Sequence, residues 1–203
     1  MTHTDPKAEY GALAVALAAR LAIAESPVEP ARFADELRRL LPDNDAGELH
    51  ALVGKAVRSV ASAEPTGEFA VSLGLERGVT GFIDHTVPVA LHAWLSHPFD
   101  LQAAVVDMVR CGGDTDSTAA IVGGIVGSAV GKDGIPPDWL KGLCEWPRTV
   151  SWMERLAGQL HDVRTSGTPG RPLRLPAWGI LPRNQCFAAV VLAHGFRRLA
   201  PPY

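Results

Sequence analysis

The chain of 203 residues is long enough for one domain with a sizeable core, or for two small domains. With 47% hydrophobic and 20% charged residues, its composition is that of an ordinary globular protein. The formal net charge of −3 excludes a broad electrostatic attraction to nucleic acid or to an anionic membrane. Neither is therefore expected as a partner.

The cysteines and the first residues predict a cytoplasmic protein. Cys111, Cys144 and Cys186 lie far apart without a CxxC spacing, and reduced thiols are the expectation for such a set. The opening "MTHTDPKAEY" has no apolar stretch of the signal-peptide kind. The longest apolar run, residues 119–130, is shorter than the roughly 20 residues that a membrane span needs.

Helical periodicity extends over nearly the whole chain. Thr4 or Asp5 is expected to cap a first helix that has Pro6 at its first position. Similar signals predict further helices over about 30–41, 45–62, 67–75, 88–96, 98–111, 115–130, 137–143, 148–163 and 183–199, with Asp45 capping the third and Pro88 in the first turn of the fifth.

No segment alternates for long enough to predict a strand. The fold class predicted from these patterns is all-α, a multi-helix bundle with short connections. A single helical domain is expected over residues 1–203, with a connector rich in proline and glycine over 164–182 before the last helix.

The stretch "CGGDTDSTAAIVGGIVGSAVG", from Cys111 to Gly131, carries the most specific chemistry. Asp114 and Asp116 stand where an apolar helix begins, and free backbone N–H groups and the helix dipole favour negative charge there. Gly112 and Gly113 allow a tight backbone and the close approach of a ligand.

Two acidic side chains at a helix start also have a simpler interpretation, because aspartate and serine are common helix caps. With the hydroxyl of Ser117 or Thr118, however, the two carboxylates form a cluster of hard oxygen ligands that suits Mg²⁺ or Mn²⁺. The capping interpretation does not explain the small residues that recur at every fourth position after the motif. That small face predicts a closely packed neighbouring helix, and its members are Ala119, Gly123, Gly127 and Gly131.

The segment "GGDTDSTAAIVGGIVGSAVGKDGIPPDWL" resembles the C-terminal metal motif of the ADP-ribosylglycohydrolase family, which includes the hydrolase that removes ADP-ribose from dinitrogenase reductase. That motif is GGDTDT or GGDTDS, a helix of small residues, a glycine, then Ile-Pro and a tryptophan. The opening "THTDPKAEYGALAVALAARLA" is similar to the family's TH-x-DP segment, and "RNQCFAAVVLAHGFRRLAPPY" is similar to the tail of one bacterial branch.

The resemblance implies a hydrolase with metal ions in the central cleft of an all-α domain. It implies that Asp114, Asp116 and Ser117 bind Mg²⁺ or Mn²⁺, and that the two aspartates are the catalytic residues. The metal would polarise ribose hydroxyls and orient a water that removes ADP-ribose from a modified protein or a related conjugate. The residues then expected at the substrate are His3, beside the bound ADP-ribose, and Gly112 and Gly113.

Two segments that normally begin this family, a GDALG-type segment and a TDDT motif, are absent from the sequence. The chain is therefore expected to be truncated at its N-terminus and to supply only part of the metal site. The first hypothesis is an active Mg²⁺-dependent hydrolase. The alternative is a catalytically impaired half-site, or an ADP-ribose-binding module, that needs a partner chain for the missing ligands. Either way a homo-oligomer or a separate partner for the N-terminal half is expected, because half of a helical domain leaves apolar surface uncovered.

Two other groups of residues are expected to be structural. His85 and His92 are seven residues apart, but no carboxylate completes a metal-ligand set around them. The tryptophans of the last third are expected to anchor the core rather than to stack on an adenine, and they are Trp139, Trp146, Trp152 and Trp178.

Overall fold

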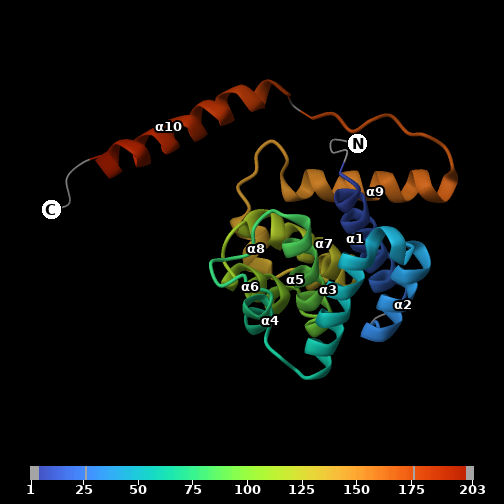
Figure 1. Ribbon diagram of the computed structural model, residues 1–203. Coiled ribbons are helices and arrows are strands. Elements are labelled where there is room, and N and C mark those ends of the chain that lie inside the picture. The colour runs from blue at the N-terminus through green and yellow to red at the C-terminus, as the bar shows by residue number, and fades with distance from the viewer. Residues whose placement is uncertain (1–4, 26, 176, 200–203) are drawn as a thin grey trace. The chain divides into compact units, whose positions relative to one another are not determined.

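The structure is a computed structural model that describes residues 5–25, 27–175 and 177–199. These residues form helices joined by loops, and no strand occurs among them, which confirms the predicted all-α fold. The chain divides into two compact units, residues 1–136 and residues 137–203 (Figure 1). A single domain over residues 1–203 stays a prediction.

The first unit contains the longest series of helices, and capping aspartates start two of them. Asp5 caps the first helix by accepting a hydrogen bond from the Lys7 N–H at 2.9 Å, and Asp100 accepts one from the Ala103 N–H at 2.8 Å. The elements are α1 (Pro6–Ala24), α2 (Pro30–Leu40), α3 (Asp43–Ala61), α4 (Thr66–Ser72), α5 (Ile83–Ser96), α6 (Leu101–Arg110), α7 (Thr115–Val130) and the 3₁₀ turn η1 (Lys132–Gly134).

Two helices, α3 and α5, begin earlier in the sequence than predicted. Helix α3 begins at Asp43, with Pro42 at its N-cap and a kink at Ala46, while the side chain of Asp45 lies outside the described residues. Helix α5 begins at Ile83, five residues before Pro88. Pro88 is tolerated in the second turn because the carbonyl that loses its N–H partner belongs to the first turn of the helix.

Helix α5 forms the centre of the first unit. It packs against α1, α3, α4, α6 and α7 (Figure 1). Every residue from Thr86 to Leu95 is buried. Trp94 of this helix meets Phe33 of α2 edge to face, with ring centroids 5.4 Å apart. The hydrophobic core is therefore organised around α5. The first turn of α5 contacts the loop before it through the hydrogen bond from Thr86 to Thr80.

Helix α7 has the bounds that the sequence predicts, and its small face is covered as expected. A Cβ atom on Gly123 would lie 3.6 Å from the side chain of Val105, and one on Gly127 would lie 3.8 Å from that of Leu101. Both neighbours belong to α6. The small residues therefore allow α6 and α7 to pack closely, which holds the start of α7 in place.

The second unit contains α8 (Pro137–Gly142), α9 (Val150–Ser166), the 3₁₀ turn η2 (Ala177–Gly179) and α10 (Ile180–Leu199). Helix α10 has no buried residue. The interpretation of the tryptophans as core anchors is wrong for three of the four, because Trp139, Trp146 and Trp178 are exposed, while Trp152 is half-buried. Trp146 and Trp178 instead contact each other edge to face at 5.6 Å. In the described part of the chain, no helix has the length and apolar character that would let it cross a membrane.

Candidate functional site

Two loops meet at the start of α7. Val79, in the loop between α4 and α5, forms a parallel bridge with Gly113. The Val79 N–H donates to the Gly112 carbonyl at 3.1 Å, and the Asp114 N–H donates to the Val79 carbonyl at 2.7 Å. These bonds fix the backbone of the acidic motif against the segment that leads into α5.

The two glycines of the motif are explained by this contact. Gly112 and Gly113 have φ angles of +70° and +82°, in the left-handed region that favours glycine. A Cβ atom on Gly113 would lie 2.7 Å from both the nitrogen and the carbonyl carbon of Val79. Gly78 is constrained from the other side, since its Cβ would lie 2.5 Å from the Gly113 nitrogen. The glycines therefore let two backbones touch, and their predicted contact with a substrate stays a prediction.

Asp114 is the N-cap residue of α7, but its side chain makes no capping hydrogen bond. Its carboxylate lies against Gly81, where an added Cβ atom would be 2.6 Å from Asp114 Oδ2. The helix is started by the Asp114 backbone, whose carbonyl accepts from the Thr118 N–H at 3.1 Å. The half-buried Asp114 carboxylate therefore points toward the loop at Gly81 and does not cap the helix.

Asp116, in the first turn of α7, lies beside Asp114. A hydrogen bond between the two carboxyl side chains lowers the pKa of Asp116, and the backbone N–H groups of Ser117 and Asp116 lower it further. Asp116 and Ser117 are exposed. The structure therefore brings two predicted ligands together, with the hydroxyl of the third in the same helical turn.

The oxygen donors of Asp114, Asp116 and Ser117 are of the type that binds a hard cation, but they are too few to complete its coordination. Carboxylate and hydroxyl oxygens are ligands that Mg²⁺ and Mn²⁺ accept, and Mg²⁺ requires six donors, several of which are usually waters. Among the residues that the structure describes, no group of three or more His, Cys, Asp or Glu side chains is arranged to hold a metal ion. This chain can thus supply Asp114, Asp116 and Ser117 to such a site, and other donors must complete it.

The loop beside the motif is held by the first turns of α5. The Thr80 hydroxyl and His85 Nδ1 are hydrogen-bonded at 2.8 Å, and the Thr86 hydroxyl donates to the Thr80 carbonyl at 2.7 Å. Phe82 is 59% exposed, and its ring tilts against that of His85 with centroids 5.8 Å apart. His85 thus orders the loop between Val79 and α5.

Sequence reasoning missed Lys7, which connects three helices. Its Nζ donates to Glu48 on α3 at 2.6 Å and to Asp84 on α5 at 2.7 Å. These two bonds, with Asp84 first, raise the pKa of Lys7 above its usual value. A small cavity of about 60 Å³ lies beside the three side chains. No local pattern could have shown these partners, which are 41 and 77 residues away in the sequence.

Cys111, directly before the two glycines, has a partly buried thiol. The Cys111 thiol donates to the Asp107 carbonyl at 3.3 Å, and burial, followed by the charge of Asp107, raises its pKa. The thiol therefore stays protonated at neutral pH. His3 lies outside the described residues.

Comparison with known proteins agrees with the fold and the acidic motif. Residues 1–169 match the sequence model of the ADP-ribosylglycohydrolase family, and the chain belongs to that family. The match includes Gly112 to Ser117 and ends within the segment that follows α9.

A curated relative is the protein named ADP-ribosylhydrolase ARH3 from Gallus gallus, which is 22% identical over 187 residues. The alignment covers 80% of this chain and 49% of the relative, so the chain spans about half the length of the protein that it matches. No solved structure gives a significant match.

Proposed function

We propose that the chain takes part in the metal-dependent hydrolysis of an ADP-ribosyl conjugate, with Asp114, Asp116 and Ser117 as ligands of Mg²⁺ or Mn²⁺. The observation that carries the proposal is the convergence of two carboxylates at the start of α7, where the Asp114 side chain makes no helix cap. Membership of the ADP-ribosylglycohydrolase family supports the substrate class. A cytoplasmic location is part of the same proposal.

The protein's own residues would act mainly by positioning. The Val79–Gly113 bridge fixes the backbone of Asp114, and the close packing of α6 against α7 fixes the first turn that carries Asp116. The lowered pKa of Asp116 keeps its carboxylate ionised and able to accept a cation at neutral pH. His3 and the Gly112–Gly113 turn would contact the ADP-ribose.

Mg²⁺ or Mn²⁺ bound there would polarise the ribose hydroxyls next to the anomeric carbon and orient the attacking water. Cleavage of the N- or O-glycosidic bond would pass through a transition state with oxocarbenium character. The oxygens of Asp114 and Asp116 would hold negative charge near the ribose throughout, which favours the positive charge that develops on the sugar.

The direct test measures ADP-ribose released from an ADP-ribosylated protein by the purified chain in Mg²⁺, in Mn²⁺ and in EDTA. The proposal expects release that EDTA abolishes and that either metal restores. Release at the same rate in EDTA would contradict the metal-dependent mechanism.

A second candidate function is a half-site that binds ADP-ribose but needs other polypeptide for turnover. Two observations favour it. The described residues bring only two carboxylates to the motif, and the chain spans about half the length of the curated relative. Binding of ADP-ribose without release from a conjugate would support this form. Release that appears only when a polypeptide with further acidic ligands is added would support it more strongly.

Helix α10 supports the prediction that the chain self-associates or binds a partner. Seven of its large apolar side chains are more than half exposed, and exposed apolar surface on one element marks interaction sites. The residues are Leu181, Phe187, Val190, Val191, Leu192, Phe196 and Leu199.

We therefore expect light scattering at micromolar concentration to give a mass above the 21.6 kDa of one chain. Phe196→Glu should shift the protein toward the monomer, because it places a charge on the apolar surface of α10. Ile23→Glu is the matched control, since Ile23 is equally exposed but lies on α1. A monomer under all conditions, with no partner required for binding, would contradict the expectation.

A further inference from the structure

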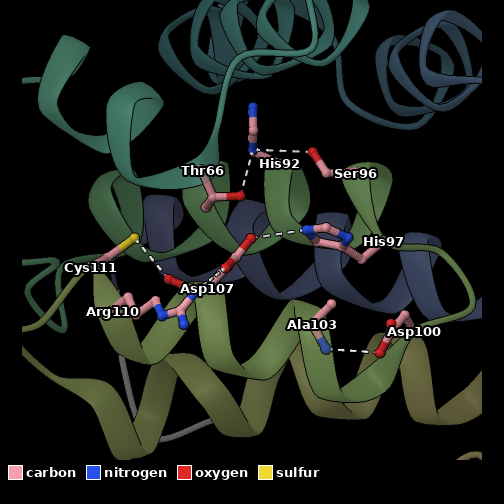
Figure 2. A network of polar contacts seen from close by, with 9 residues as sticks. All are labelled: Thr66, His92, Ser96, His97, Asp100, Ala103, Asp107, Arg110 and Cys111. Atoms are coloured by element: carbon pink, nitrogen blue, oxygen red, sulfur yellow. Dashed lines mark hydrogen bonds and ion pairs between the residues drawn. The ribbon is translucent and has the colours of Figure 1, made fainter.

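The buried side chain of His92 joins helices α3, α4 and α5. His92 of α5 is fully buried, and its ring stacks on Phe69 of α4 with centroids 4.6 Å apart. His92 Nε2 is 2.9 Å from the Ser59 hydroxyl at the end of α3, and Nδ1 is 3.1 Å from the Thr66 hydroxyl at the start of α4. Figure 2 shows Thr66 and Ser96 reaching the ring, with Ser96 at 3.5 Å from Nδ1.

The hydrogen bonds have one consistent direction. The Ser59 hydroxyl donates to the Glu64 carboxylate, so its oxygen must accept from the ring. His92 Nε2 therefore carries the hydrogen, and Nδ1 accepts from the Thr66 hydroxyl. The geometry assigns a neutral Nε2–H imidazole that completes a chain of donors from Thr66 through His92 and Ser59 to Glu64.

The series of hydrogen bonds from Thr66 to Glu64 begins at α4, the helix that leads to the loop beside the acidic motif. Thr66 and Phe69 attach α4 to α5 through the imidazole. Helix α4 then leads, through residues 73–78, to Val79, whose backbone pairs with Gly112 and Asp114. A change at His92 can therefore reach the motif through about one helix and one short loop.

A second proton on His92 would break this arrangement. Nδ1–H could no longer accept from the Thr66 hydroxyl, and two donors would face each other. Burial disfavours the charged ring and is the main reason that the pKa of His92 is lowered to about 4. Glu64 and Asp107 favour the charge and His97 opposes it, while the contacts from α4 are uncharged. Two basic side chains of α3 also line the cavity beside Ser59 and Glu64, and they are Lys55 and Arg58.

We propose that protonation of His92 releases α4 from α5 and, through residues 73–79, loosens the pairing of Val79 with Gly113. The network is thus an acid-sensitive latch on the loop that holds Asp114. The neutral ring favours the closed form, so the latch is fully closed above the ordinary histidine pKa near 6.5 and opens as the pH falls toward 4.

The first measurement is the protection of single backbone amides against hydrogen exchange at pH 7.5 and at pH 4.5, corrected for the intrinsic pH dependence of exchange. The amides of Val79 and Asp114 report the latch, because both are hydrogen-bonded across the bridge. Amides in the buried part of α1 report global unfolding. Linkage to one proton predicts that protection at the bridge falls roughly seventyfold between the two pH values, while the amides of α1 stay better protected than the bridge at both. Equal protection of the bridge and of α1 at pH 4.5 would mean that the bridge opens only by global unfolding, and would overturn the latch.

His92→Gln removes the titration, so protection at Val79 should no longer respond to pH. His50→Gln is the matched control, because His50 is also a buried histidine but lies on α3 and is hydrogen-bonded to the Leu41 carbonyl. An equal pH response in His92→Gln would overturn the proposal.

Two further measurements do not depend on that variant folding. Thr66→Val keeps the shape of the side chain and removes the donor to Nδ1, so the midpoint of opening should move to higher pH. An unchanged midpoint would overturn the proposal. Nitrogen chemical shifts of His92 at pH 7.5 should report hydrogen on Nε2, and hydrogen on Nδ1 would overturn the assigned chain.

Discussion

Asp116→Asn is expected to weaken Mn²⁺ binding by at least about tenfold, because loss even of a residue that only supports a ligand commonly costs that much. The substitution keeps the size of the side chain and removes one of the two converging charges. A Mn²⁺ titration followed by electron paramagnetic resonance measures the change directly, without a need for turnover.

The same variant should change the melting temperature little when metal is absent. Asp116 is exposed, and its lowered pKa means that the fold favours the ionised side chain, so Asp116→Asn removes a small favourable contribution. We therefore expect its melting temperature in EDTA to equal that of the wild type or to fall slightly below it, while Mn²⁺ raises it less. Asp133→Asn is the control, since Asp133 is an exposed carboxylate in η1. Equal Mn²⁺ affinity in wild type and Asp116→Asn would show that the two carboxylates are not a metal site.

Gly113→Ala is expected to reduce both stability and metal binding. Its φ of +82° disfavours any side chain, and the new Cβ atom would collide with the backbone of Val79. Backbone strain of this kind costs about 1–3 kcal/mol, to which the collision adds. Because Asp114 follows directly, separation of the two loops would also displace its carboxylate.

Gly124→Ala provides the matched comparison for urea unfolding. Gly124 lies within α7, no atom lies within 4 Å of the position of its added Cβ, and alanine in a helix is favoured over glycine by roughly 0.5–1 kcal/mol. We expect Gly124→Ala to stabilise the protein and to leave Mn²⁺ affinity unchanged. If Gly113→Ala behaved in the same way, the loop contact would not be what requires glycine at residue 113.

The sequence predicted the helices well where a local signal starts or ends them. Asp5 and Pro6 define the start of α1, and α7 has the predicted limits from Thr115 to Val130. The start of α5 was misplaced because Pro88 gives a strong local signal, whereas Phe82, the real N-cap residue, makes no capping bond. No capping side chain marks the start of α5, so the proline was the stronger local signal.

The candidate site was predictable as a motif but not as a geometry. Asp114, Asp116 and Ser117 were identified from spacing and resemblance, and the structure places the two carboxylates together. The second loop was not foreseen, because the Val79–Gly113 bridge joins backbones and leaves no pattern in side-chain types.

The role of His92 was equally hidden. The sequence offered it only as one of a histidine pair with His85, a pair that was not expected to bind metal. Its actual partners, Ser59 and Thr66, lie 33 and 26 residues away. Tertiary hydrogen bonds of this kind follow from packing, and only the structure can assign them.

The central claim is that Asp114, Asp116 and Ser117 hold a divalent cation against ADP-ribose. The measurement that tests it most directly is a calorimetric titration of ADP-ribose into the purified chain, first with Mg²⁺ and then with EDTA. We expect binding in Mg²⁺ that is lost in EDTA and in Asp116→Asn. Binding of equal strength in Mg²⁺ and in EDTA, or no binding in either, would contradict the claim.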